Sequence, residues 1–513
     1  MNKILLLNPP YSLNRTSDFE IGFPVHLVFL GRVALIEGWA ADYLDMALEE
    51  KDGYDSFKKL ALFLSDKCIK IVGISNHTVR TSLTTMKISR YIKSLRPDIN
   101  IITGGVGSTF MYKELLEQEV CIDYVFRGYA QKGLQSFLNN FTKTEKLNAH
   151  GLVYRDSYIK INPQVNLTEE DFHIPEISQL DISRYLKWTD TYPLLTHTGC
   201  LSNCNFCTSI MPWACQRNEF YRQVRHVTEE MMMAIKSGFG RFFMCANIFT
   251  SNKAWTLELC NEIVQRAFHR IISWTCMTRV ELVDKEVLDA LAVAGCGNIA
   301  FGIEGVGAQE WNDLNKGHRC LQKIRDAFML TKNAGIKTSA YIMIGTPNQT
   351  KTDIEETISF IREVAPDFRI VSFFHPFPGT PYWDRPTDFA LHDIEPLENW
   401  NLHESPICTT KYFTKEELLS TAVRMYLDHG NGNGIRPEFD CLITREVSSM
   451  ATDKIPDCAK AALVLIEQKE LHAVNDILAI IAEKYGNRGR LITIYWLSAF
   501  LRDGVLTLAR RRG

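Results

Sequence analysis

Short apolar runs alternate with amphipathic segments along the first 150 residues of the chain. The apolar runs read KILLLN, WAADYLDM, IKIVGIS, NIITGG and DYVFRG, and each has the length of a buried strand. Between the third and fourth runs, residues 81–97 repeat their apolar side chains at helical spacing. Strands that alternate with helices predict a doubly wound α/β domain over residues 1–150, whose ligand binds at the carboxyl ends of parallel strands.

Small and polar residues follow several of these predicted strands. Ser75 and His77 follow the third strand, and the stretch GGVGST, with Gly104, Gly105 and Ser108, follows the fourth. Glycines allow the backbone to approach a bulky ligand and present N–H groups to a phosphate, but a tight strand-to-helix turn explains them equally well. The G-x-G-x-x-G spacing is absent, which argues against a nicotinamide-binding domain.

The pattern changes twice further along the chain. Residues 151–190 contain prolines and acidic residues without a regular period, and we expect a linker there. A second series of strand candidates follows, reading YPLLTHT, RFFMCA, SWTCMTR, NIAFGIE, TSAYIMIG and FRIVSFFHPF. These six units predict a partial (β/α)6 barrel over residues 191–395, with the working residues at the carboxyl ends of its strands. Residues 396–513 predict a helical C-terminal domain.

Composition narrows the class of protein. The 57 basic and 60 acidic residues give a net charge of −3 without long runs of one sign, so we expect no nucleic-acid partner. The 14 cysteines are scattered among apolar residues, which is typical of a reducing compartment. The apolar run at the N-terminus is too short for a signal peptide, and no stretch reaches the roughly 20 residues of a membrane span. We therefore expect a cytoplasmic protein.

Three cysteines lie close together in the stretch GCLSNCNFC, directly after the first strand of the second series. Cys200, Cys204 and Cys207 have the spacing C-x3-C-x2-C. Three thiolates in one loop suit an iron–sulfur cluster that keeps one iron open for a further ligand. Zinc is the competing metal, with Cys215 as the nearest fourth ligand, although the usual paired C-x2-C knuckles are absent. Chance clustering of buried cysteines is the remaining alternative.

This loop resembles the signature loop of radical S-adenosylmethionine (SAM) enzymes. The segments TRVELVDKEVLDALAVAGCGNIAFGIEG, IMIGTPNQTKTDIEETISFIRE and HPFPGTPYWD are also similar to that superfamily. The N-terminal NPPYS, VGIS, GGVGS and DYVFRGYAQKGLQSFL resemble the Rossmann-like domain of its cobalamin (B12)-binding branch, which includes the class B methyltransferases. The resemblance spans about residues 1–390.

The resemblance implies roles for individual residues. Cys200, Cys204 and Cys207 would hold a [4Fe–4S] cluster whose open iron binds SAM and cleaves it to a 5′-deoxyadenosyl radical. The residues that match the family's SAM contacts are Phe206, Asn247, Arg279, Glu304 and Gly345. For Arg279 and Glu304, a strand-end ion pair is the alternative. Cys245 and Ala246 stand where the family usually carries acidic residues, which leaves Asn247 as the nearby polar match.

For cobalamin, the resemblance implies contacts from the strand-end residues named above. These are Ser75, His77, Gly104, Gly105 and Ser108. The motif D-x-H-x-x-G, by which many corrinoid proteins supply a histidine to cobalt, is absent from the sequence, as it generally is from this branch. His77 is the candidate nearest the lower face of cobalt, and a loop histidine bonded to backbone is the alternative.

The leading hypothesis is a cobalamin-dependent radical SAM enzyme that methylates an unactivated carbon of a small metabolite in secondary metabolism. Its partners would be that metabolite and a reductant such as flavodoxin or ferredoxin, and the cofactors would carry the difficult chemistry. An altered or empty cobalamin domain would instead fit a radical dehydratase, rearrangement or oxidation enzyme. A third alternative is a corrinoid or iron–sulfur binding protein without activity.

Overall fold

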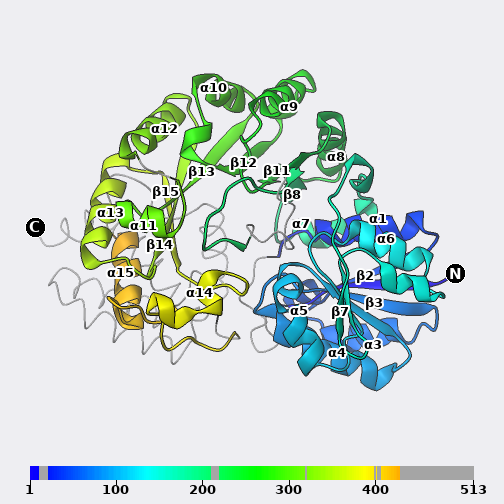
Figure 1. Cartoon of the computed structure of the whole chain (residues 1–513). Helices are drawn as coiled ribbons and strands as arrows, with labels where there is room; N and C mark the ends of the chain where they lie inside the picture. Colours follow the sequence, from blue (N-terminus) through cyan, green and yellow to red (C-terminus); the bar gives the residue numbers. More distant parts are fainter. Residues whose placement is uncertain (11–20, 209–218, 318–319, 398–399, 401–405, 428–513) are drawn as a thin grey trace, which may run out of the picture. The chain divides into compact units, whose positions relative to one another are not determined.

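The computed structural model describes residues 1–10, 21–208, 219–317, 320–397, 400 and 406–427 (Figure 1). The chain forms two compact units. The first comprises Met1–Asn203, Cys207–Cys276 and Val293–Cys296, and the second comprises Cys204–Phe206, Met277–Ala292 and Gly297–Gly513. Among the described residues, no helix is both long enough and apolar enough to cross a membrane.

A seven-stranded sheet forms the core of the first unit. In sequence order its strands are β1 (Lys3–Asn8), β2 (Ala40–Asp45), β3 (Ile69–Ser75), β4 (Asn100–Gly104), β5 (Tyr124–Phe126), β6 (Leu152–Arg155) and β7 (Ile159–Ile161). Their spatial order is β2-β1-β3-β4-β5-β6-β7. The first five strands are parallel, as predicted, whereas β6 and β7 pair in antiparallel fashion.

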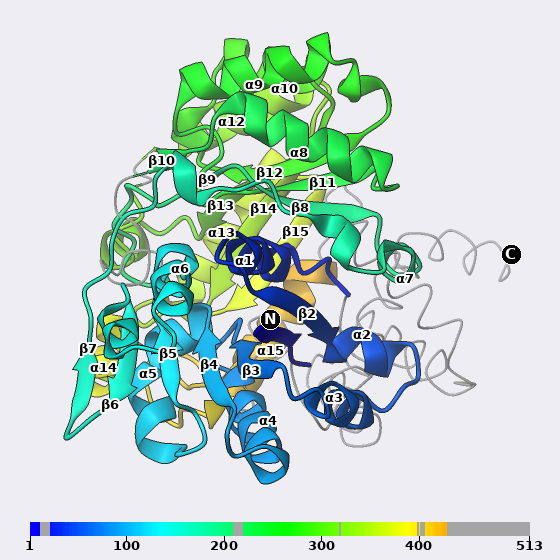
Figure 2. The same ribbon diagram turned by 90° about the vertical axis from the view of Figure 1, so that its right-hand side faces the viewer.

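Helices cover both faces of this sheet (Figure 2). Helices α1 (Val25–Ile36) and α6 (Gln131–Asn139) pack on one face, and α3 (Ser56–Leu64) and α4 (Thr81–Leu95) pack on the other. The short α2 (Met46–Lys51) follows β2, and α5 (Val106–Gln118) follows β4. Successive side chains of a strand point to opposite faces, so Ile4 and Leu6 of β1 meet α1 and α6, while Leu5 and Leu7 meet α3 and α4. The doubly wound arrangement is confirmed.

The segment for which we expected an irregular linker contains a β-hairpin. Strands β6 and β7 extend the first sheet by two antiparallel strands, joined by a turn in which the N–H of Asp156 donates to the carbonyl of Tyr158 (3.1 Å). The sequence LVYRDSYIKI has the β-branched and aromatic residues of a strand pair around a polar turn, but the prolines and acidic residues after it obscured this signal. Helix α7 (Ile182–Leu186) lies near the end of the same segment.

The second sheet contains the six parallel strands that the sequence predicts. In the first unit, β8 (Thr191–Leu195), β11 (Arg241–Cys245) and most of β12 (Ser273–Thr278) lie side by side. In the second unit, β14 (Lys337–Ile344) lies between β13 (Cys296–Glu304) and β15 (Phe368–Phe373). The short strands β9 (His197–Thr198) and β10 (Phe220–Tyr221) form a separate antiparallel pair.

The helices of this region follow the strands as in a (β/α) series. They are α8 (Val224–Lys236), α9 (Lys253–Gln265), α10 (Lys285–Val293), α11 (Ala308–Asp313), α12 (Leu321–Asn333), α13 (Lys351–Val364) and α14 (Pro381–Asp384). Of the expected helical C-terminal domain, α15 (Lys415–Leu427) is present. Residues 428–513 of that predicted domain lie outside the described residues.

The turn between β4 and α5 requires a glycine at position 105. Gly105 has φ +102°, and a Cβ there would lie 2.6 Å from the carbonyl oxygen of Asn76. Both the backbone conformation and the close approach exclude a side chain. Gly104, one residue earlier, differs because the nearest atom to a Cβ would be the carbonyl oxygen of Phe126 at 3.8 Å, an ordinary contact distance.

These adjacent glycines therefore provide a matched pair of variants. We expect Gly105→Ala to lower the free energy of unfolding of the first unit by about 1–3 kcal/mol, because the alanine is strained and meets backbone. We expect Gly104→Ala to change it by less than about 1 kcal/mol. Urea unfolding followed by circular dichroism measures both values. Equal losses in the two variants would contradict the steric argument.

Candidate functional site

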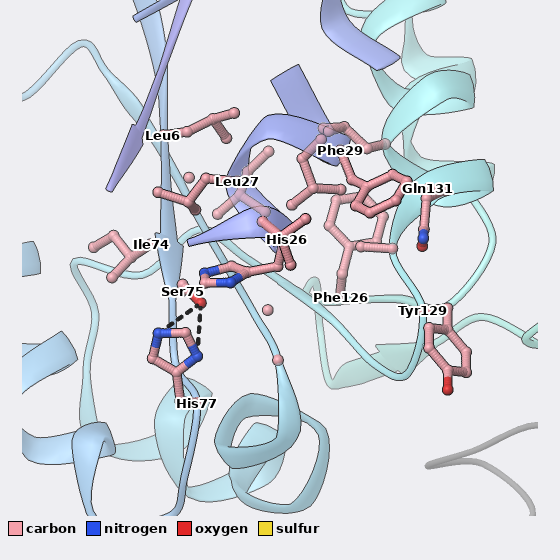
Figure 3. Close-up of a pocket in the computed structure, with 18 of the residues that line it drawn as sticks. Leu6, His26, Leu27, Phe29, Ile74, Ser75, His77, Phe126, Tyr129 and Gln131 are labelled. Carbon is pink, nitrogen blue, oxygen red and sulfur yellow. Dashed lines mark hydrogen bonds between the residues drawn. The ribbon is translucent and has the colours of Figure 1, made fainter. Parts of the chain in front are cut away.

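The first unit contains a cavity of about 350 Å³ between its first sheet and helices α1 and α6. Most of its walls are apolar, and they include Ile4, Leu6, Leu27, Phe29, Ile102, Phe126 and Leu134. The hydrogen-bonding side chains around it are His26, Ser75, His77, Tyr129 and Gln131 (Figure 3). Strands β3 and β4 contribute Gly73 and Gly104, which have no side chains to fill the space. An apolar cavity with few polar groups is typical of a ligand site.

The cavity also reaches the second sheet. Leu195 and Cys245, the last residues of β8 and β11, line it within the first unit. The cavity therefore lies at carboxyl ends of strands from both sheets, where ligands of α/β proteins bind. Burial raises the pKa of Cys245 to about 12, so this side chain stays an uncharged thiol at neutral pH.

Four of the five residues expected to contact cobalamin line this cavity. These four are Ser75, His77, Gly104 and Gly105. The fifth, Ser108, is not among the lining residues: it is fully buried in α5, with its Oγ 2.6 Å from Thr103 Oγ1. We missed His26 on α1, because a single histidine in an apolar helix carries no motif.

His77 is held by a chain of hydrogen bonds between side chains. Its Nε2 contacts Asn8 Oδ1, Asn8 Nδ2 donates to Asp45 Oδ1 (3.0 Å), and the hydroxyl of Tyr185 donates to Asp45 Oδ2 (3.1 Å). The partner of this imidazole nitrogen is thus a side chain and not the backbone. Burial lowers the pKa of His77 to about 4, so its imidazole is neutral at pH 7.

The cysteine loop follows β9. None of the three cysteines forms a disulfide with a described residue; Cys204 is buried, and Cys200 and Cys207 are partly exposed. In the first unit, Asn247 Nδ2 donates to the carbonyl of Gly199 (2.7 Å), which fixes the start of the loop. In the second unit, the N–H of Asn205 donates to the carbonyl of Leu314 (2.9 Å). The amide of Asn247 is thus engaged with the loop itself.

The donor set of this loop suits a cluster better than one metal ion. Within the described part of the chain, no three His, Cys, Asp or Glu side chains converge closely enough to hold a single ion. A tetrahedral zinc site requires such convergence, whereas a cuboidal cluster takes each thiolate on a different iron. Cys215, the candidate fourth ligand of zinc, lies outside the described residues.

Positively charged side chains surround Cys204 in the second unit. Arg279 Nη1 lies 4.0 Å from Cys204 Sγ, and Arg279 Nη2 donates to the carbonyl of Lys316. Lys316 Nζ lies 2.9 Å from Glu304 Oε1 and 5.8 Å from the centroid of the Phe206 ring. Four predicted site residues, Cys204, Phe206, Arg279 and Glu304, therefore lie together, and Lys316 joins them. We missed Lys316 because no motif marks it.

Arg279 and Glu304 do not form the ion pair that we gave as the alternative to SAM binding. Arg279 pairs with Glu281 (3.1 Å), and Glu304 pairs with Lys316. Burial lowers the pKa of Lys316, but the charges of Glu304 and Cys204 outweigh it, and the net pKa is raised above its usual value. Glu304 has φ +65° at the irregular end of β13, a strained conformation that surrounding contacts must hold.

A buried carboxyl group, which we did not predict, links the loops after β13 and β14. Gly345, with φ +81°, donates its N–H to Gln349 Oε1 (2.7 Å), and Gln349 Nε2 donates to Glu310 Oε1 (2.9 Å). Thr346 Oγ1 also donates to Glu310 Oε1 (3.3 Å). Burial raises the pKa of Glu310 to about 8, so the group is mainly protonated at pH 7. Glu310 thus holds the turn at Gly345 in place through the side chain of Gln349.

Two family models match the chain in the regions that contain these sites. The model of the radical SAM superfamily matches residues 194–361, which include the cysteine loop and the cluster around Lys316. The model of the B12 binding domain matches residues 16–138, which include most of the cavity lining. The predicted cofactors are confirmed: a [4Fe–4S] cluster and SAM for one domain, and cobalamin for the other.

Two curated relatives differ in the reaction that their names give. The uncharacterized methyltransferase PH0819 of Pyrococcus horikoshii is 25% identical over 443 residues, which cover 83% of this chain and 92% of that protein. The anaerobic magnesium-protoporphyrin IX monomethyl ester cyclase of Cereibacter sphaeroides is 26% identical over 389 residues, which cover 73% of this chain but 62% of the cyclase.

Two solved structures share the fold. OxsB, described as a cobalamin-dependent S-adenosylmethionine radical enzyme with aqua-cobalamin and SAM bound, has a TM-score of 0.68 at 14% identity, covering 99% of this chain and 82% of its own. TsrM from Kitasatospora setae, a radical SAM methyltransferase with tryptophan and a SAM analogue bound, has a TM-score of 0.65 at 18% identity. It covers 74% of this chain and 75% of its own. The predicted combination of the two α/β domains is confirmed.

Glu310 predicts a pH dependence of stability. In the unfolded chain this carboxyl loses its proton near pH 4.5, whereas in the folded protein it keeps the proton up to about pH 8. The folded state therefore binds more protons between these values, so stability falls as the pH rises through this window and levels off above it. Glu310→Gln keeps the hydrogen-bond acceptor without titrating.

We expect the stability of Glu310→Gln relative to wild type to increase by roughly 1 kcal/mol per pH unit between pH 5 and 8. Above pH 8 the difference stays constant. Urea unfolding at each pH gives the difference directly. A difference that does not change with pH would mean that Glu310 is ionised in the folded protein.

Proposed function

Because the chain belongs to the cobalamin-binding branch of the radical SAM superfamily, we propose that it is a methyltransferase acting on an unactivated carbon. The observation that carries this proposal is the cavity of about 350 Å³ on the first sheet. This cavity offers space for cobalamin, which supplies the methyl group in this class of reaction. The name of the Pyrococcus relative, which matches most of the chain, supports the same reaction class.

In this proposal, cobalamin is held at the carboxyl ends of the first sheet. Gly104 and Gly105 allow close approach of the cofactor, and the apolar cavity between the sheet and α1 receives the nucleotide tail. Ser75 and His77 lie at its polar edge. Ser108 acts indirectly, by holding the start of α5 to Thr103. A B12 cofactor bound here would supply a transferable methyl group.

Cys200, Cys204 and Cys207 hold the [4Fe–4S] cluster in this proposal, and a bound cluster with SAM supplies the 5′-deoxyadenosyl radical. The residues of the chain bind and orient SAM. Glu304, fixed by Lys316, accepts hydrogen bonds from hydroxyl groups, and Arg279 offers a positive charge for a carboxylate. Phe206 provides a ring face, Gly345 forms the turn beside the adenine, and Asn247 fixes the loop.

The second candidate is a radical reaction without methyl transfer. The cyclase of Cereibacter sphaeroides, which matches 73% of this chain, favours it. Both candidates cleave SAM to 5′-deoxyadenosine, but methyl transfer in addition converts SAM to S-adenosylhomocysteine. The two products therefore separate the two candidates.

The test uses the full chain, loaded anaerobically with iron, sulfide and cobalamin and then given SAM and dithionite without substrate. We expect 5′-deoxyadenosine, together with S-adenosylhomocysteine in an amount close to that of bound cobalamin, because one methyl group can leave SAM per cofactor. Cys204→Ala should form no 5′-deoxyadenosine, because the cluster then lacks one of its three cysteine ligands. 5′-Deoxyadenosine without S-adenosylhomocysteine would favour the second candidate.

The proposal also covers the class of substrate, the electron donor and the cellular compartment. We propose a small metabolite of secondary metabolism as the substrate and a reductant such as flavodoxin or ferredoxin as the electron donor. The cytoplasm is the compartment that fits, because free thiols and a low-potential cluster require reducing conditions. The substrate can be identified by comparing the methylated metabolites of cells that contain this protein with those of cells that lack it.

Replacing Lys316 tests the binding of SAM separately from the later steps of the reaction. Lys316→Met leaves the strained Glu304 buried without its counter-charge, so the carboxylate no longer holds its position. We expect the Kd for SAM to rise about tenfold or more, a change of about 1.4 kcal/mol. Equilibrium binding of SAM to the protein loaded with its cluster measures this.

Lys285→Met is the matched control, because Lys285 forms an exposed pair with Asp289 on α10. We expect wild-type affinity for SAM from this variant. If Lys316→Met also bound SAM with unchanged affinity, Glu304 would not depend on Lys316 for its role.

A further inference from the structure

One polar atom at the cavity of the first unit has no hydrogen-bond partner among the described residues. It is Nε2 of His26, which is shielded from solvent although the residue as a whole is partly exposed. His26 lies in the first turn of α1 and is one of the residues that line the cavity (Figure 3). A buried nitrogen without a partner carries a desolvation cost, which a ligand atom in the cavity would remove.

The position of this imidazole is fixed by its neighbours. The rings of His26 and His77 pack edge to face, with centroids 4.6 Å apart and planes at 89°. His77 in turn contacts Asn8, which bonds to Asp45. His26 is therefore presented to the cavity by a rigid support and not by a flexible side chain.

The imidazole of His26 is uncharged. Burial lowers its pKa well below the usual value, and the neighbouring His77 lowers it further. The ring of His77, which packs against it, is also neutral, since burial lowers the pKa of His77 to about 4. A neutral imidazole offers one hydrogen bond and no countercharge, so it is a poor partner for a phosphate or a carboxylate.

The walls define the rest of the ligand. Around His26, the cavity is bounded by Leu27, Phe29, Ile74 and Phe126, and elsewhere mainly by aliphatic side chains. Such walls accept an apolar, flat group and penalise every further polar atom that they bury. The part of the cavity around His26 therefore fits an uncharged heteroaromatic ring with one nitrogen that bonds to His26. The other hydrogen-bonding side chains of the lining are Ser75, His77, Tyr129 and Gln131.

We propose that His26 is the hydrogen-bond anchor for the base at the end of the cobalamin nucleotide tail, and that Nε2–H of His26 donates to the free ring nitrogen of that base. This inference rests on the proposed binding of cobalamin in the cavity. The side chains that bound the cavity around His26 are Leu27, Phe29, Ile74 and Phe126, so this part of the cavity prefers dimethylbenzimidazole to adenine. Adenine would bury further nitrogen atoms, including an exocyclic amine, without partners.

The experiment compares three corrinoids on the cobalamin-free full chain by spectrophotometric titration. The three are hydroxocobalamin, its adenine-containing analogue, and cobinamide, which has no nucleotide tail. For the wild type, we expect the adenine analogue to bind at least about tenfold more weakly than hydroxocobalamin. Equal or tighter binding of the adenine analogue would overturn the single-anchor inference.

The variants isolate the contribution of the ring nitrogen. His26→Phe keeps an aromatic ring against His77 but removes the donor, and we expect about tenfold weaker binding of hydroxocobalamin with unchanged binding of cobinamide. His26→Gln, which restores an N–H donor, should recover most of the lost affinity. His150→Phe, at an exposed histidine of the same unit, should leave all three affinities unchanged.

Each other outcome has a distinct meaning. Unchanged binding of hydroxocobalamin to His26→Phe would overturn the inference while leaving the proposed function intact. Equal losses for hydroxocobalamin and cobinamide in both His26 variants would also overturn it, because His26 would then support the fold and not the tail. If the wild type bound none of the three corrinoids, the proposed function itself would fail.

Discussion

Two glycines on neighbouring parallel strands leave the space on which the rest of this account depends. Gly73 on β3 and Gly104 at the end of β4 have no side chains to close the gap between the first sheet and helices α1 and α6. Protein interiors normally close such gaps, because a void forfeits the dispersion contacts of the atoms around it. The half-open cavity of about 350 Å³ beside the packed core of the first unit is therefore the place in this unit that suits a ligand. Its place at strand ends of both sheets follows from the parallel topology.

The second unit buries charged side chains, which costs more free energy than leaving a cavity. Lys316 and Glu304 have side chains only 9% and 12% exposed, and each compensates the buried charge of the other. Arg279 places a positive charge near the thiol of Cys204, with its Nη1 4.0 Å from Sγ. Glu310 solves the same problem differently, by keeping its proton. Glu304, which pairs with Lys316 at the end of β13, and the protonated Glu310 in α11 thus have different roles.

Regular patterns made much of this structure predictable. Five strands of the first sheet and all six of the second follow from short apolar runs, and the cysteine spacing indicates the cluster loop. The hairpin of β6 and β7 was missed because prolines and acidic residues close to it suggested a linker. The roles of three further residues could not be predicted from the sequence, for a different reason. These residues are His26, Lys316 and Glu310. Their roles depend on partners brought near by folding, such as His77 for His26, and no spacing along the chain encodes that proximity.

The central claim is that one chain binds both a corrin and an iron–sulfur cluster. The most direct measurement is the cobalt and iron content of the protein purified anaerobically from cells supplied with cobalamin. The account predicts about one cobalt per chain together with about four irons, the content of one cuboidal cluster. Four irons without cobalt would contradict it, because the cavity of the first unit would then serve another ligand and the methyl-transfer proposal would lose its basis.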